Sequence, residues 1–71
     1  MAKYFYRNQN NEKVYIKSID TANGKLTFTK NAAQAYQGRD GYYAEPLRDS
    51  LVFGFSEEYP EIKNVQIDYS Y

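Results

Sequence analysis

The chain has 71 residues, and its nine Lys and Arg residues are balanced by nine Asp and Glu residues. A formal net charge of zero argues against a protein that binds polyanions without specificity. Because the sequence contains neither Cys nor His, it excludes disulfides, thiolate or imidazole catalysis, and zinc sites built from those side chains. We therefore expect a protein that is not an enzyme and that binds no metal and no cofactor.

Apolar runs in this sequence are short. None reaches the length of about 18–20 residues that a membrane-spanning helix needs, and the first residues lack the apolar stretch of a secretory signal. The sequence therefore predicts a cytoplasmic protein without membrane association.

Tyrosine is the most unusual component of the sequence, with nine Tyr and four Phe in 71 residues. The core of the protein must therefore be rich in aromatic side chains. A domain of this size rarely draws more than about 3–5 kcal/mol from a single core, and oligomerisation is the supplement that this composition leaves open. We expect one small domain over residues 1–71, for which a homodimer is an option.

Residues 3–7 form the first predicted strand because they are dense in residues that favour β-structure. A strand would place Tyr4 and Tyr6 on one side and Phe5 on the other. One of these two sides must therefore face away from any helix that covers the sheet. The polar run at residues 8–11 predicts a turn.

Residues 13–20 and 25–30 predict two further strands, and Asn23 followed by Gly24 between them is a strong signal for a hairpin. These strands would continue the first one as an antiparallel meander.

Two loop lengths can connect the hairpin strands, and the hydrophobic pattern distinguishes them. A loop of two residues would leave Val14 and Ile16 on the face opposite Phe28. A loop of three residues pairs Ser18 with Phe28 and brings both aliphatic side chains to the face of Phe28. We predict the second register, which turns Ile19 to the other face.

Residues 31–37 predict one or two helical turns, because Asn31 is a good capping residue and three alanines follow it. Gly38 ends this segment and opens a loop that is rich in glycine.

The segment at residues 45–59 admits two interpretations. Pro46 suits the first position of a helix, and large apolar side chains recur every four residues, at Leu47, Leu51, Phe55 and Tyr59. Gly54 and the β-prone residues 51–53 favour a strand instead. We predict a helix and keep the strand as the alternative.

The last segment alternates strictly between apolar and polar residues, which predicts a strand with Val65, Ile67, Tyr69 and Tyr71 on its dry face. The order of elements predicts an α+β fold. It comprises a three-stranded antiparallel meander, a short helical turn, one longer helix packed on the sheet, and a C-terminal strand.

Three segments, at residues 4–7, 24–35 and 58–62, resemble short phage and prophage proteins of Gram-positive bacteria. This resemblance implies an accessory protein that is encoded by a phage and acts in the cytoplasm of the host cell. It assigns no functional residue.

The excess of tyrosine suggests a binding surface, because Tyr offers a large and rigid contact area together with a hydrogen-bonding hydroxyl. Phe53 falls outside the helical stripe, and an exposed Phe beside Tyr42 and Tyr43 would mark a contact patch. We therefore predict non-catalytic binding of a host or phage protein through a sheet face rich in Tyr and Phe. The candidate residues are Tyr4, Tyr6, Tyr15, Tyr42, Tyr43 and Phe53. The alternative interpretation is that tyrosine merely fills the core.

Charge is unevenly distributed along the chain. Residues 1–39 contain seven basic and two acidic residues, whereas residues 40–71 contain two basic and seven acidic residues. This pattern supports an alternative function, the binding of single-stranded nucleic acid, in which bases stack on tyrosines above a basic surface. The candidate residues are Lys3, Arg7, Lys13, Lys17, Lys30 and Arg39. The competing interpretation is that the two halves neutralise each other in the folded domain.

Overall fold

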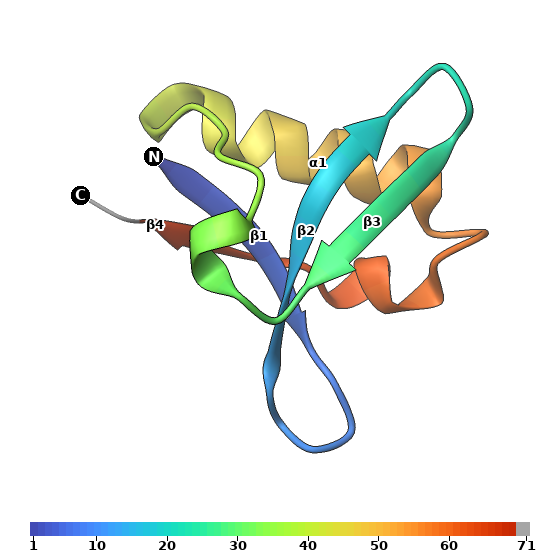
Figure 1. Ribbon diagram of the computed structural model, residues 1–71. Helices are drawn as coiled ribbons and strands as arrows, with labels where there is room; N and C mark the ends of the chain where they lie inside the picture. Colours follow the sequence, from blue (N-terminus) through green and yellow to red (C-terminus); the bar gives the residue numbers. More distant parts are fainter. Residues whose placement is uncertain (70–71) are drawn as a thin grey trace.

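A four-stranded antiparallel sheet dominates the computed structural model, which describes residues 1–69 (Figure 1). The strands are β1 (Ala2–Arg7), β2 (Lys13–Asp20), β3 (Lys25–Thr29) and β4 (Gln66–Tyr69), in the spatial order β3-β2-β1-β4. The one α-helix among residues 1–69, α1 (Ala44–Phe55), lies across one face of the sheet (Figure 1). The predicted α+β fold is confirmed, including the meander, the helix packed on the sheet and the C-terminal strand.

Strand alternation divides the aromatic residues of β1 between the two faces of the sheet. Tyr4 packs in the large core between the sheet and α1. Phe5 faces the opposite way, where its ring lies 5.8 Å from that of Tyr15 in a second, smaller cluster with Ala35. The side of β1 that faces away from the helix is therefore the side of Phe5.

Strands β1 and β2 pair over only part of their length, and the segment at residues 36–38 fills the space where they separate. The backbone N–H of Tyr36 donates to the carbonyl of Ile16 in β2 at 2.8 Å. Ala2 in β1 exchanges two backbone hydrogen bonds with Gly38, at 3.0 and 2.7 Å. These bonds anchor the beginning of the loop that leads to α1.

The turn between β2 and β3 contains four residues, 21–24, because Asp20 pairs with Lys25. Neither loop length considered from the sequence is correct. The carboxylate of Asp20 accepts hydrogen bonds from the backbone N–H and the side-chain amide of Asn23, at 3.2 and 2.8 Å, and so stabilises the wider turn. Gly24 has a φ of 65°, the left-handed conformation that glycine adopts without strain.

A bulge in β2 explains why the predicted register is wrong. Ser18 pairs with Thr27 rather than with Phe28, and Ile16 pairs with Phe28, so that one extra residue, Lys17, lies between the paired positions. Ile16 therefore shares the face of Phe28, as predicted. Ile19 also packs against the core beneath α1, contrary to the prediction, because the bulge shifts the alternation by one residue.

The predicted helical turn after β3 is present but short. The 3-10 helix η1 (Ala32–Gln34) begins after Asn31, whose side-chain oxygen accepts a hydrogen bond from the backbone N–H of Ala33 at 3.0 Å.

Helix α1 confirms the helical interpretation of residues 45–59, although the helix ends at Phe55. Leu51 and Phe55 are buried. Tyr59 lies beyond the helix, and its hydroxyl accepts a hydrogen bond from the backbone N–H of Leu26 at 3.1 Å. This bond satisfies one backbone donor on the edge strand β3.

The chain returns to the sheet through the 3-10 helix η3 (Pro60–Asn64), which is followed by β4. Val65 is buried and Ile67 is half-buried, as the predicted alternation requires, whereas Tyr69 is exposed. The predicted position of Tyr71 lies outside the described residues.

Replacement of Leu51 tests whether α1 supports the fold. Because Leu51 is 1% exposed at the centre of the core, Leu51→Ala should lower the free energy of unfolding by about 2–5 kcal/mol. The measurement is urea unfolding followed by circular dichroism. Phe53→Ala, in the same helix but on an exposed side chain, is the control and should change the free energy by no more than about 0.5 kcal/mol. Equal effects of the two variants would contradict this packing.

Candidate functional site

Tyr4 and Tyr15, both predicted to contact a partner, belong to the core instead, with exposed fractions of 0% and 6%. The hydroxyl of Tyr4 donates to the carbonyl of Ala44 at 2.9 Å. The hydroxyl of Tyr15 donates to the carboxylate of Asp68 at 3.2 Å. Because each phenol finds a polar partner within the fold, the ring can be buried, and neither side chain is available to another protein.

Burial raises the pKa of the Tyr4 phenol above its ordinary value, and the nearby Tyr36 raises it further. Burial is also the main cause of the raised pKa of Tyr15, where the hydrogen bond to Asp68 acts in the same direction. Both phenols are therefore neutral at physiological pH and serve as hydrogen-bond donors.

Tyr6 occupies an intermediate position at the rim of the main core. Its ring meets that of Phe28 edge to face, with centroids 5.7 Å apart. Burial raises its pKa, and the carboxylate of Glu61 adds to this effect. Part of the Tyr6 side chain remains accessible, but its contacts are those of a core residue.

The other three predicted aromatic residues are exposed. Tyr42 and Phe53 are the most exposed large apolar side chains among residues 1–69, at 83% and 94%, and Tyr43 is 55% exposed. Tyr42 and Tyr43 belong to the 3-10 helix η2 (Gly41–Tyr43) that precedes α1, and their rings meet edge to face. The guanidinium of Arg39 lies 5.2 Å from the centre of the Tyr43 ring, a distance typical of a cation–π contact.

Four of the six predicted basic residues lie on the sheet face opposite α1, which we call the basic sheet face; they are Lys3, Arg7, Lys13 and Lys17. Lys3 and Arg7 lie two residues before and after Phe5 in β1 and therefore share its face, and Lys13 pairs with Arg7 across the strands. Lys30 and Arg39 lie elsewhere. Lys30 pairs with Glu12 at 3.2 Å, and Arg39 lies over Tyr43.

The rings on the basic sheet face are covered rather than open to bases. The ammonium of Lys13 lies 4.7 Å from the centre of the Phe5 ring, and the guanidinium of Arg7 lies 5.9 Å from it. Phe5 and Tyr15 are both buried. Lys13 also lies 3.6 Å from Asp68, which offsets part of the positive charge. The basic sheet face can attract phosphates, but these rings offer no platform for stacking.

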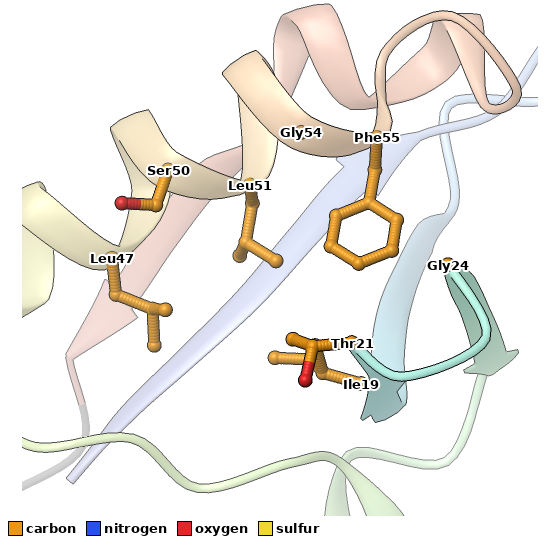
Figure 2. Close-up of a pocket in the computed structure, with 8 residues that line it drawn as sticks. All are labelled: Ile19, Thr21, Gly24, Leu47, Ser50, Leu51, Gly54 and Phe55. Carbon is orange, nitrogen blue, oxygen red and sulfur yellow. The ribbon is translucent and has the colours of Figure 1, made fainter.

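A groove along one flank of α1 is a feature that the sequence analysis did not identify. Its apolar part has a volume of about 330 Å³ and is shown in Figure 2, where Leu47, Leu51 and Phe55 extend from α1 toward Ile19 and Thr21. The lining residues are Ile19, Thr21, Gly24, Leu47, Ser50, Leu51, Gly54 and Phe55. We call this part the apolar pocket.

A second pocket of about 400 Å³ adjoins the first toward the beginning of α1. It is lined by Tyr36, Arg39, Tyr43, Pro46, Leu47 and Ser50, and we call it the arginine pocket. Leu47 and Ser50 line both pockets, so the two are neighbours on the same flank of α1, and we call them together the α1 groove. Hydrophobic periodicity does not predict where the hairpin turn and the loop before α1 lie relative to the helix. The groove between them therefore could not be predicted from the sequence.

The charge in the α1 groove comes from Arg39. Its side chain forms no ion pair with a carboxylate of residues 1–69, and no acidic residue of that range lines either pocket. The neighbouring Asp40 pairs instead with the amino group of Met1. The groove is therefore apolar at one end and positively charged at the other.

No family model, curated protein or solved structure matches this chain. No helix in the described part of the chain is long and apolar enough to cross a membrane. Residues 1–69 contain no group of three or more acidic side chains placed to hold a metal ion. The α1 groove and the aromatic residues beside it are thus the features from which a function can be argued.

The alkaline limit of stability tests the burial of Tyr4. Its pKa is raised in the folded state above the ordinary value of about 10. The stabilisation is therefore fully present below pH about 10 and is lost as the pH rises through the raised pKa. Tyr4→Phe should lower the free energy of unfolding by about 1 kcal/mol at neutral pH. Above pH 10, the free energy of unfolding of this variant should fall less steeply with pH than that of the unmodified protein.

Urea unfolding at a series of pH values between neutral and strongly alkaline measures this effect. Tyr42→Phe, at an exposed position, is the matched control and should follow the unmodified protein throughout. A Tyr4→Phe variant whose stability falls as steeply with pH as that of the unmodified protein would contradict the role given to this phenol.

Proposed function

We propose that this chain is a non-catalytic protein-binding module that receives a segment of another protein in the α1 groove. The observation that carries the proposal is the exposure of Tyr42, Tyr43 and Phe53 beside a groove with an apolar floor. Large aromatic side chains are the residues that contribute most to protein interfaces, particularly next to apolar pockets. The packing of this fold does not require these three side chains to be exposed.

The geometry of α1 supports the assignment of Phe53 to the edge of the groove. Residues three apart in a helix are neighbours on its surface, so that Phe53 lies next to Ser50. Seven residues separate it from Pro46, which corresponds to about two turns and the same side of the helix. Ser50 and Pro46 both line the groove, and Phe53 is therefore placed to extend its outer wall.

Tyr43 supports the proposal from the other end. Its ring lines the arginine pocket, and the guanidinium of Arg39 lies over the face of this ring. A partner that covers Tyr43 would gain contact with a ring whose position is already restricted, which lowers the entropic cost of binding.

The partner is a host or phage protein according to the sequence resemblance, and this origin, like the cytoplasmic location, stays a prediction. Tyr4, Tyr6 and Tyr15 have no part in the proposed surface, which takes only Tyr42, Tyr43 and Phe53 from the predicted set.

Capture from a host lysate tests the proposal through paired variants. The immobilised chain should retain a protein saturably and in stoichiometric amount. The double variant Tyr43→Ser with Phe53→Ser should lose this protein by about tenfold or more, because an aromatic anchor at an interface contributes roughly 2 kcal/mol. Quantitative mass spectrometry of the eluates measures the loss.

Lys17→Ser, on the basic sheet face, is the control and should retain the same protein in unchanged amount. The proposal is wrong if no protein is retained saturably, or if the double variant retains it as well as the unmodified chain does.

A second candidate function, binding of single-stranded nucleic acid, is favoured by one observation. Lys3, Arg7, Lys13 and Lys17 lie on the basic sheet face, where Arg7 and Lys13 pair directly across the strands. Since the rings on that face are covered, we propose that any such binding is electrostatic and insensitive to base sequence.

Titration of a labelled oligothymidylate at about 20 and about 200 mM salt tests this candidate. Four phosphate contacts predict a slope of about −3 when the logarithm of the affinity is plotted against that of the salt concentration. Lys13→Gln should reduce the magnitude of the slope by about 0.7, and Lys30→Gln, outside the face, should not change it. A titration that stays flat at low salt excludes this function.

A further inference from the structure

We infer that the segment bound by the α1 groove is extended and carries an apolar side chain and a carboxylate two residues apart. This inference rests on the proposed function and specifies the chemistry of the partner. The apolar side chain occupies the apolar pocket, and the carboxylate meets Arg39 in the arginine pocket.

The apolar pocket is lined by residues that suit the binding of one branched aliphatic or aromatic side chain. Its walls are the side chains of Ile19, Leu47, Leu51 and Phe55, which converge from the hairpin and the helix (Figure 2). Gly54 forms part of the rim, and apart from its chain neighbours and the nearby backbone of its own helix, no atom lies within 4 Å of the position that a Cβ would take there. The pocket therefore opens to solvent beside this glycine, where a partner side chain can enter.

The arginine pocket has the chemistry of a carboxylate site. Arg39 can form two parallel hydrogen bonds with a carboxylate, a geometry that a lysine cannot offer. Its contact with the Tyr43 ring, at 5.2 Å, restricts the guanidinium before a ligand arrives. Because Arg39 forms no ion pair with residues 1–69, a carboxylate on the partner would not have to displace one from within the described fold.

The spacing of the two pockets sets the spacing of the two partner groups. Leu51 lines only the apolar pocket, and Leu47, one helical turn earlier, lies on the boundary of the arginine pocket. These four residues correspond to about 6 Å along the helix axis. In an extended peptide, alternate side chains point the same way and are about 6–7 Å apart. Side chains at positions i and i+2 thus fit the two pockets.

Nucleic acid fits the α1 groove less well than a peptide does. A phosphate could bind Arg39, but the apolar pocket fits an aliphatic or aromatic group that lies at a fixed distance from the anion. A second copy of this chain is the other occupant to consider, and the experiment below separates it from a foreign peptide.

Selection from an mRNA-displayed library of random peptides tests the inference with the intact protein. The enriched peptides should share an apolar residue and an Asp or Glu two positions away. The best of them, synthesised with a fluorescent label, provides the probe for affinity measurements by fluorescence anisotropy.

Two variants address the two pockets separately. Arg39→Gln should weaken the binding of the probe about tenfold or more, and exchange of the probe's acidic residue for its amide should cause no further loss in this variant. Gly54→Leu places a side chain at the mouth of the apolar pocket and should weaken binding to a similar extent. It should not lower stability, because an interior glycine disfavours a helix. Lys17→Gln, on the opposite face, should leave the affinity unchanged.

The outcomes distinguish this inference from the proposed function. Enriched peptides that lack the acidic residue, or that bind Arg39→Gln with unchanged affinity, overturn the inference and leave protein binding by the groove in place. If neither the library nor the lysate yields a ligand, both are wrong. Sedimentation that shows a dimer of this chain, dissociated by Gly54→Leu, would assign the groove to a second copy and would overturn the inference of a foreign acidic peptide.

Discussion

The buried hydrogen bond from the Tyr4 hydroxyl to the Ala44 carbonyl links two parts of the fold that lie 40 residues apart in the sequence. Tyr4 lies in β1, an inner strand of the sheet, and Ala44 is the first residue of α1. The ring also lies against Gly38, where a Cβ would come within 3.1 Å of the Tyr4 side chain. Because a buried phenol without an acceptor would destabilise the fold, this hydrogen bond fixes where the helix begins above the sheet. The loop from Gly38 to α1 is thereby held at both ends.

The separation of β1 from β2 creates the room for this arrangement. Backbone groups that the two strands do not use with each other pair with residues 36–38 instead. As a result, the loop that carries Arg39 and Tyr43 lies beside the beginning of α1, while the turn at residues 21–24 lies beside its end. The flank of the helix between them is left uncovered, and this is where the α1 groove runs.

Hydrophobic periodicity predicted the elements of this fold because each strand and the helix buries one face. It failed where a single residue breaks the period, as at Lys17, the extra residue of the bulge in β2, because such a residue leaves no local signal in the sequence. It also could not assign roles to the tyrosines. Tyr4 and Tyr43 are equally compatible with burial or exposure, and only the position of a hydrogen-bond acceptor decides between them. The exposure of Phe53 was predictable, since this residue falls outside the apolar stripe of its helix.

Gly54 connects the prediction of the helix with the proposed site. Considered alone, a glycine inside a helix is unfavourable by about 1 kcal/mol relative to alanine. Packing does not explain it, because no side chain or other element of the fold lies within 4 Å of the place where a Cβ would be, and an alanine would fit. A residue that lowers stability without relieving a steric conflict points to a requirement other than folding. Under the proposed function, that requirement is an open entrance to the apolar pocket, since a large side chain at this position would project over the space between α1 and the hairpin. The same glycine that argued for a strand in the sequence therefore supports the binding groove in the structure.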